Sequence, residues 1–296
     1  MTGCAALTPA VLRRHPIPGP EAQGDKEERG RVLVVAGSPE VPGAALLAAT
    51  AALRVGAGKV QLAVPAAIAL PLAVAMPEAR VFSMAETASG GIDPGEAGLL
   101  VAHARECRAI LAGPGMMDYE AAAALAAALL REAGHLPIVL DAAALAGLSQ
   151  VRVELRGQEE RAVITPHPGE MARLLDVDVA DIEADPLASA RQAANRFGVV
   201  AVLKSARTHI VGRDGEAFHL DEGDIGLATA GSGDVLAGIV TGLLARGASP
   251  LAASLWGVYL HREAGARLAR DIGKLGYLAR ELLVEIPRVL NEASVR

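Results

Sequence analysis

Thr229 to Gly238 reads T-A-G-S-G-D-V-L-A-G, and this stretch decides the predicted fold. Three small residues, Gly231 to Gly233, run into Asp234, and apolar residues then follow at the spacing of one face of an α-helix. A glycine-rich turn that opens a helix leaves backbone N–H groups without intrahelical partners, and the helix dipole adds positive potential at the same end. The turn therefore suits an anion such as phosphate. On the other helix face, Gly238 and Gly242 leave room for close approach of a neighbouring backbone.

Asp234 does not fit a plain anion site, because a carboxylate repels phosphate. It fits a site in which the carboxylate takes a proton from a hydroxyl group while the N–H groups of Gly231, Ser232 and Gly233 hold a phosphoryl group in transfer. The competing interpretation is that Asp234 is only an N-cap, since Asp is favoured there, and that the glycines form a loop. The rest of the sequence has to decide between the two.

The composition bounds the class of protein. The 296 residues suffice for one large α/β domain or two small ones, and 52% hydrophobic with 21% charged residues is typical of a globular chain. The net charge of −6 without a basic cluster argues against a nucleic acid partner. Cys4 and Cys107 form no C-x-x-C pair, which argues against a metal–thiolate site. No signal peptide or membrane-length apolar run is evident, so we expect a cytoplasmic protein with no membrane partner.

Short β-branched runs alternate with Ala- and Leu-rich helical segments along most of the chain. This alternation is typical of a parallel sheet with helices on both faces. We expect an N-terminal arm over residues 1–24 and a single domain over residues 25–296. The predicted strands lie at 31–37, 60–64, 81–84, 108–112, 138–140, 162–164 and 199–203, with a hairpin formed by 209–211 and 216–219. The predicted helices lie at 43–55, 66–75, 96–105, 119–133, 186–197, after the 229–234 turn, at 251–269 and near 277–290.

Polar residues follow several of these predicted strands where each strand ends. In open α/β sheets, ligands bind outside the carboxyl ends of the strands. Residues that are distant in the sequence are therefore expected to converge on one crevice. They are Asp141, Thr165, His167, Glu170 and Lys204.

The segment T-P-H-P-G-E over 165–170 is more restricted than an ordinary loop, because two prolines fix the backbone around His167. His167 could bind substrate, and Glu170 could hold a water molecule on Mg²⁺. The alternative is a rigid turn with Glu170 in the first turn of a helix. The segment K-S-A-R-T over 204–208 could meet phosphates or ribose, or be a solvated connection. Gly113-Pro114-Gly115 could be a backbone shelf against a ligand, or a tight turn.

Three common motifs are absent from the sequence. There is no G-x-x-x-x-G-K-[ST] segment, no G-x-G-x-x-G after the first predicted strand and no G-x-S-x-G. Their absence argues against a P-loop enzyme, a standard dinucleotide-binding fold and a serine hydrolase, respectively.

The motifs that are present occur together in the order of a known family. The G-S-G-D turn and the lysine after a late strand resemble the ribokinase-like superfamily, which implies a three-layer α/β/α fold with a mostly parallel central sheet. Within it, I-T-P-H-P-G-E-M-A-R-L-L, V-L-K-S-A-R-T, A-T-A-G-S-G-D-V-L-A-G-I and the opening D-K-E-E-R-G-R-V-L-V-V-A-G-S resemble the ADP- or ATP-dependent NAD(P)H-hydrate dehydratases. The resemblance covers roughly residues 25 to 290.

The resemblance implies a metabolite-repair enzyme, a hydro-lyase that restores NADH and NADPH from their hydrated forms NADHX and NADPHX. ADP or ATP, with Mg²⁺, phosphorylates the hydroxyl group on the nicotinamide ring, and loss of phosphate restores the double bond. Phosphate is a good leaving group, whereas hydroxide is a poor one. The family also implies a homo-oligomer, with a tetramer as the suspected state.

The resemblance also implies roles for individual residues. Asp234 is the expected base, and the Gly231, Ser232 and Gly233 amides are expected to stabilise the transferred phosphoryl group. Glu170 is the expected metal-binding residue, acting through water. The expected NAD(P)HX-binding residues are Ala44, Gly115, His167 and Asp234. The expected nucleotide-binding residues are Lys204, Ser205, Ala206, Arg207, Thr208 and Gly233.

Two positions depart from the family pattern. Asp141-Ala142-Ala143 stands where the family usually has Asp-Ala-Asp, which removes a carboxylate, and Asp224 stands where an Asn is usual, which adds a negative charge. Both changes could weaken activity or shift the substrate. Two alternatives therefore stay open: a small-molecule kinase of the same superfamily, acting on a hydroxymethylpyrimidine or hydroxyethylthiazole alcohol, and a non-catalytic nucleotide-binding protein.

Overall fold

The protein is described by a computed structural model, which covers residues 3–19, 26–151, 161–221 and 225–295. The described residues form a ten-stranded sheet in the order β1-β10-β9-β8-β7-β6-β5-β2-β3-β4. Only the β8–β9 and β9–β10 pairs are antiparallel among these neighbours. The strands are β1 (Cys4–Ala6), β2 (Arg31–Val35), β3 (Lys59–Pro65), β4 (Ala79–Met84), β5 (Ala109–Ala112), β6 (Ile138–Leu140), β7 (Ala162–Ile164), β8 (Val200–Leu203), β9 (Thr208–Val211) and β10 (Ala217–Leu220).

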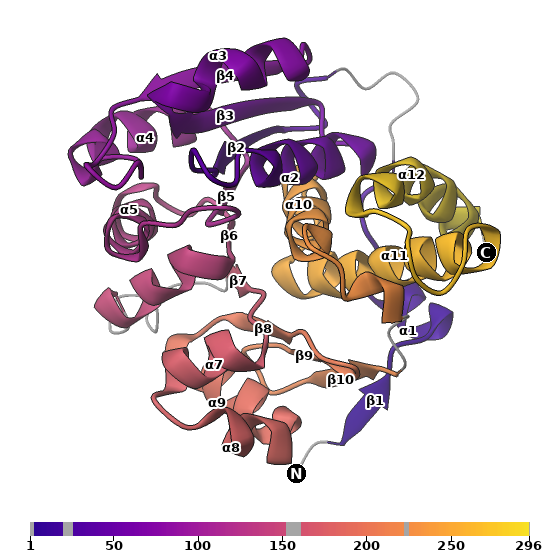
Figure 1. The fold of residues 1–296 in the computed structure, drawn as a ribbon. Helices are drawn as coiled ribbons and strands as arrows, with labels where there is room; N and C mark the ends of the chain where they lie inside the picture. Colours follow the sequence, from indigo (N-terminus) through magenta and orange to yellow (C-terminus); the bar gives the residue numbers. More distant parts are fainter. Residues whose placement is uncertain (1–2, 20–25, 152–160, 222–224, 296) are drawn as a thin grey trace.

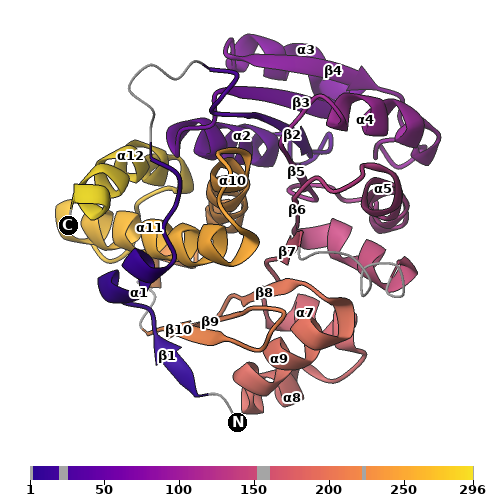
Figure 2. The ribbon, with the colours of Figure 1, turned by 180° about the vertical axis from the view of Figure 1, so that it is seen from behind.

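Helices cover both faces of the sheet, and Figures 1 and 2 show the two helical layers from opposite sides. The predicted three-layer fold with a mostly parallel sheet is therefore confirmed. One layer contains α1 (Pro9–Arg14), α2 (Gly43–Arg54), α3 (Ala66–Ala75), α10 (Ser232–Ala245), α11 (Pro250–Asp271) and α12 (Ala279–Val295). The other contains α4 (Ala97–Ala104), α5 (Tyr119–Glu132), the 3₁₀ helix η2 (Ala142–Gln150), α7 (Pro168–Leu175), α8 (Val179–Ala184) and α9 (Pro186–Phe197).

The central strands are buried on both faces, as near-continuous apolar runs predict. In β2, Val32 and Val34 belong to the core under α2 and α10, whereas Leu33 and Val35 belong to the core under α4 and α5. This division follows from the two-residue period of a strand. Alternate side chains of the same strand thus pack against the two helical layers on opposite faces of the sheet.

The close approach expected at Gly238 is present between α10 and α2. A Cβ atom on Gly238 would overlap the backbone carbonyl of Ala48, and one on Gly242 would lie 2.7 Å from the carbonyl oxygen of Ala52. The middle of α10 therefore packs backbone to backbone against α2.

The predicted strands and helices are all present, with shifts at their ends. The structure adds elements that were not predicted as such: β1, α1, η2, α7, α8 and the short 3₁₀ helices η1 (Pro94–Glu96) and η3 (Ile225–Leu227). Most of these elements are too short for a clear period. In α7 the apolar residues Met171, Ala172, Leu174 and Leu175 do follow a helical period, and a helix whose first turn contains Glu170 is the alternative interpretation of 165–170.

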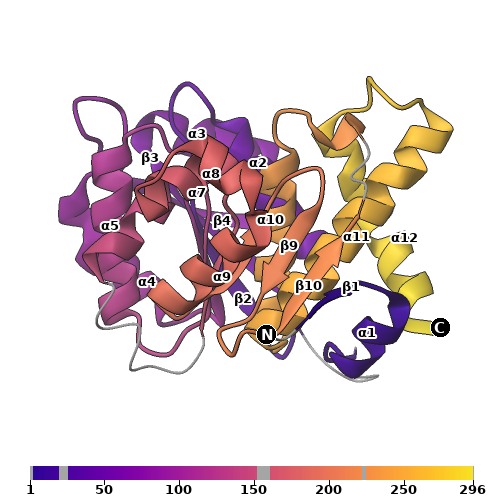
Figure 3. The ribbon, with the colours of Figure 1, turned by 90° about the horizontal axis from the view of Figure 1, so that it is seen from below.

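The described part of the predicted N-terminal arm lies against the domain, as Figure 3 shows. β1 pairs in parallel with β10, with Cys4 opposite Ala217. The backbone carbonyl of His15 accepts a hydrogen bond from Trp256 Nε1 of α11 at 2.9 Å. Residues 3–19 thus add an edge strand and a covering helix to the fold. Among the described helices, none has the length and apolar character that crossing a membrane requires.

Candidate active site

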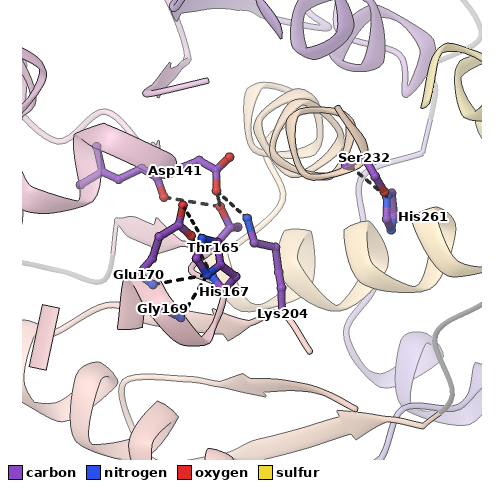
Figure 4. Close-up of polar contacts among 9 residues, drawn as sticks. Asp141, Thr165, His167, Gly169, Glu170, Lys204, Ser232 and His261 are labelled. Carbon is purple, nitrogen blue, oxygen red and sulfur yellow. Dashed lines mark hydrogen bonds and ion pairs between the residues drawn. The ribbon is translucent and has the colours of Figure 1, made fainter. Parts of the chain in front are cut away.

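Three polar side chains meet where three neighbouring strands end. Asp141 follows β6, Thr165 follows β7 and Lys204 follows β8. Asp141 Oδ1 accepts hydrogen bonds from Thr165 Oγ1 at 2.7 Å and from Lys204 Nζ at 2.8 Å, as Figure 4 shows. The expected convergence of strand-end residues on one edge of the sheet is confirmed for these three.

His167 and Glu170 form the start of α7. His167 is the N-cap, and its Nδ1 atom accepts hydrogen bonds from the N–H groups of Gly169 (3.0 Å) and Glu170 (3.4 Å). Glu170 Oε2 accepts one from the His167 N–H group at 2.8 Å, which completes a capping box. Because Nδ1 acts as an acceptor, the neutral ring has its hydrogen on Nε2. The turn is rigid with Glu170 in the first helical turn, while the His167 side chain stays 51% exposed and accessible to a ligand.

The turn before α10 has the geometry of an anion site. Gly231 is the N-cap with a φ of +88°, a conformation that favours glycine, and a Cβ atom there would also lie 2.5 Å from Leu47 Cδ1 on α2. Within the described chain, no side chain caps α10. The N–H groups of Gly233 and Asp234 belong to its first turn, where intrahelical acceptors are lacking. Lys204 Nζ lies 3.3 Å from the position of a Cβ on Gly233, which brings its charge to the same turn.

Asp234 titrates far above an ordinary aspartate. Burial raises its pKa to about 7, and repulsion by Asp141 and Glu170 adds to this effect while the charge of Lys204 opposes it. For Lys204, burial lowers the pKa, but attraction by the carboxylates raises it overall, so the lysine is a cation. Beside the strand-end cluster thus lies a buried carboxyl group that loses its proton near neutral pH, a property typical of a general base.

His261 of α11 is a site neighbour that the sequence analysis missed. Its Nε2 atom lies 2.9 Å from Ser232 Oγ and 3.0 Å from the Ser232 carbonyl oxygen, on the side of α10 away from the Asp141 cluster (Figure 4). The signal in the sequence is weak: a histidine within a mostly apolar helical stretch, which is more often a packing residue. The side chain of Ser232 therefore faces α11, and its backbone N–H group donates to the Thr229 carbonyl oxygen at 3.2 Å.

Ala44 and Gly115 meet at the point where the strand order reverses between β2 and β5. A Cβ atom on Gly115, whose φ is +66°, would lie 2.6 Å from the Cβ of Ala44. The Gly37 N–H group, after β2, donates to the Pro114 carbonyl oxygen at 2.7 Å. Such switch points are the usual ligand crevices of open sheets. Ala44 lies one helical turn before Leu47, which packs on Gly231, so this crevice adjoins the first turn of α10.

The other predicted nucleotide-binding residues are less closely gathered. Ser205, Ala206 and Arg207 are exposed on the β8–β9 connection, and Thr208 begins β9. Arg207 forms an ion pair with Asp221. The structure thus brings Lys204 and Gly233 together, whereas Ser205, Ala206 and Arg207 are exposed to solvent after Lys204.

The two departures from the family pattern have different outcomes. Ala143 is 1% exposed and lines a cavity of about 140 Å³, whose wall also contains Glu170 and Arg173. The missing carboxylate is thus replaced by apolar wall, and Lys204 keeps Asp141 as its hydrogen-bonded partner. Asp224 lies outside the described residues.

The donor set suits Mg²⁺ bound mainly through a nucleotide. Among the described residues, no three His, Cys, Asp or Glu side chains gather closely enough to hold a metal ion. Mg²⁺ commonly uses only one or two carboxylates and completes its octahedron with water and phosphate oxygens. The carboxylate of Glu170 is 13% exposed, and its Oε1 atom, which lies outside the capping hydrogen bond and 3.4 Å from His167 Nε2, fits such a role through water.

Comparison with known proteins gives a consistent result. The family model described as NAD(P)H-hydrate dehydratase matches residues 32–288. The chain is 45% identical over 294 residues to the ADP-dependent (S)-NAD(P)H-hydrate dehydratase of Xanthomonas campestris pv. campestris, covering 98% of each. It is 41% identical over 285 residues to the bifunctional NAD(P)H-hydrate repair enzyme of Moorella thermoacetica, covering 96% of this chain and 54% of that protein.

The fold is similar to that of a crystal structure from Bacillus subtilis. That structure is of an ADP/ATP-dependent NAD(P)H-hydrate dehydratase co-crystallised with ATP and Mg²⁺. The TM-score is 0.82 and the sequence identity 29%, and the match covers 99% of this chain and 100% of that one.

Proposed function

Because the chain belongs to the NAD(P)H-hydrate dehydratase family, we propose that its Asp234 crevice uses ADP or ATP to return NADHX and NADPHX to NADH and NADPH. One observation supports this most directly: a carboxyl group with a pKa of about 7 lies in the first turn of a helix, beside a lysine. A base near neutral pH and an anion-binding turn are the two parts that phosphorylation of a hydroxyl group requires.

Asp234, once deprotonated, takes the proton of the ring hydroxyl group as the hydroxyl oxygen attacks the terminal phosphorus of the nucleotide. The bond from that phosphorus to the bridging oxygen breaks, and AMP leaves when ADP is used, or ADP when ATP is used. The N–H groups of the Gly231 to Gly233 turn and the ammonium group of Lys204 stabilise the charge on the phosphoryl group in transfer. The ring phosphate then leaves with the electrons of its C–O bond. Loss of a proton from the adjacent ring carbon restores the double bond.

The other binding roles follow from position. We assign Ala44, Gly115 and His167 to the hydrated cofactor. Ala44 and Gly115 meet at the switch point of the sheet, and the His167 imidazole is exposed at the start of α7, which supports the assignment. Lys204 to Thr208 and Gly233 are assigned to the adenine nucleotide. Mg²⁺, when bound through nucleotide phosphates and a water held by Glu170, supplies neutralisation of phosphate charge. The homo-oligomeric state and the cytoplasmic location stay predictions.

The test is recovery of NADH absorbance from NADHX with Mg²⁺ and each nucleotide in turn. We expect NADH and inorganic phosphate to appear in equal amounts with at least one of ADP and ATP. No recovery with either nucleotide would contradict the proposal. A stable phosphorylated product in place of NADH would instead identify a small-molecule kinase.

A further inference from the structure

The contact between α11 and the first residue of α10 is unusual for a packing contact between helices. His261 Nε2 is within hydrogen-bond distance of both Ser232 Oγ (2.9 Å) and the Ser232 carbonyl oxygen (3.0 Å). Ser232 is 4% exposed and stands two residues before Asp234. The contact therefore joins a histidine that lies outside the crevice to the turn that contains the proposed base.

The two distances determine how the imidazole is protonated. A carbonyl oxygen can only accept a hydrogen bond, so Nε2 must be the nitrogen that has the hydrogen. Burial lowers the pKa of His261 to about 4; the bond to the Ser232 backbone opposes this, and the charge of Lys204 adds to it. His261 is thus a neutral donor at physiological pH and places no second positive charge behind the turn.

Backbone hydrogen bonds hold the turn locally, from the Ser232 N–H group to the Thr229 carbonyl oxygen at 3.2 Å and from the Val235 N–H group to the Gly231 carbonyl oxygen at 3.1 Å. Gly231 has no side chain, and no side chain of the described residues caps α10. Apolar atoms of Leu47 on α2 and Ala279 on α12 lie near Gly231. From the α11 side, His261 adds a side-chain hydrogen bond to the turn. Helix α11 has 22 residues and a largely buried face, so it is a firm support.

We propose that His261 is a positioning residue that, through Ser232, holds the first turn of α10 in the geometry needed for phosphoryl transfer. The inference rests on the proposed function. Without the contact, the amides of Gly233 and Asp234 and the Asp234 carboxylate shift relative to the phosphoryl group. Displacements of about 1 Å in a catalytic array lower rates by about 10²-fold.

The experiment compares His261→Leu, which removes the donor, with His261→Gln, whose side-chain amide can donate in its place. His103→Leu is the matched control, because His103 is also a partly buried helical histidine but stacks on Phe82 of β4, outside the crevice. We expect kcat of His261→Leu to fall by about 10- to 100-fold with KM for the nucleotide within about threefold. We expect His261→Gln to recover most of kcat and His103→Leu to match wild type.

The pH profile separates positioning from a loss of stability. In His261→Leu the acid limb of kcat/KM is expected to move from its wild-type position, because Asp234 then stands differently toward Asp141, Lys204 and Glu170. In His261→Gln it is expected to stay. Wild-type kcat in His261→Leu, or an unmoved acid limb with no rescue by His261→Gln, would overturn the inference.

Amide hydrogen exchange provides a readout that is independent of turnover. We expect exchange at Ser232 and Val235, whose N–H groups donate to the Thr229 and Gly231 carbonyl oxygens, to rise at least tenfold in His261→Leu and to stay near wild type in His261→Gln. Equal exchange in all three proteins would overturn the positioning role even if the enzyme is active. A wild-type protein that produces no NADH but shows the expected exchange pattern would contradict the proposed function and leave the positioning of the turn supported.

Discussion

The protein contains two clusters of charged side chains that differ in their balance of positive and negative charge. Between α11 and α12, Arg267 and Arg288 face Glu285 and Glu292, with N–O distances of 2.6 Å for Arg267–Glu292 and Arg288–Glu285. In the crevice, the carboxylates of Asp141, Glu170 and Asp234 act on one cation, Lys204. The first cluster is matched in charge and the second is not.

The excess of negative charge in the second cluster acts mainly on Asp234. Asp141 has the direct hydrogen bond from Lys204, and Glu170 is held by the capping box. For Asp234, burial and repulsion outweigh the attraction of Lys204. Its pKa rises to about 7, whereas the hydrogen bond to Glu292 raises the pKa of Arg267 further from the neutral range. Side chains paired with an opposite charge thus stay charged near neutral pH, whereas an excess of buried negative charge produces a carboxyl group that can exchange a proton at physiological pH.

The largest effect is expected for Asp234→Asn. Removing the base should lower kcat/KM for NADHX by at least about 10²-fold, because general base catalysis contributes that much. At pH 8 the free energy of unfolding should rise, since the variant also removes a buried, repelled charge. Steady-state kinetics and chemical denaturation measure the two quantities. Asp271→Asn, an exposed residue at the end of α11, is the matched control; activity above a tenth of wild type in Asp234→Asn would contradict a base role.

The next effect is expected for Lys204→Met, which removes the cation that offsets the three carboxylates. Since the Asp141 side chain is only 4% exposed, breaking this pair should cost about 3 kcal/mol of unfolding free energy. The pKa of Asp234 should rise above its wild-type position, so activity at pH 7 should fall and its acid limb should move to higher pH. Lys204→Arg keeps the charge and serves as the comparison. An acid limb that stays in place in Lys204→Met would show that the charges are not coupled.

The wild-type pH dependence sharpens the comparison without any mutation. Because Asp234 acts deprotonated, kcat/KM should rise about tenfold per pH unit below pH 7 and level off above the pKa of about 7. The free energy of unfolding should depend on pH in the opposite direction. Because the pKa of Asp234 is higher in the folded state, this residue stabilises the folded protein fully below about pH 4, and the stabilisation is lost as the pH rises through about 7. The loss should be absent in Asp234→Asn. Identical stability profiles for the two proteins would contradict the raised pKa.

The smallest effect is expected for Glu292→Gln in the matched cluster. The Glu292 side chain is 51% exposed, so losing its pair with Arg267 should cost about 0.5 kcal/mol of unfolding free energy and leave turnover unchanged. The difference from wild type should shrink in high salt, because exposed ion pairs are screened. Denaturation at low and high salt measures both. A change in turnover would mean that the two clusters are not independent.

Much of the site could be predicted from the sequence because parallel strands end at one edge of their sheet. That rule is enough to bring Asp141, Thr165 and Lys204 together. The left-handed conformation of Gly231 and the start of α10 also follow from local pattern, since glycine alone tolerates that backbone conformation without strain.

Other features depend on contacts that no local pattern announces. His261 is 29 residues after Ser232 in the sequence, and the bond between them exists only because α11 folds back on α10. The exposed position of Ser205 to Arg207 was also not evident, since a short polar connection can face a ligand or solvent equally well.

By itself, the sequence determined the alternation of strands and helices, the glycine turn and which polar residues follow the strand ends. These depend on backbone sterics and on periodicity, which are local properties. The tertiary structure alone decided that Asp234 titrates near neutrality, that Lys204 is shared among three carboxylates and that His261 supports the turn. Burial and Coulomb interactions depend on distances in space between distant parts of the chain, and only the packed fold sets those distances.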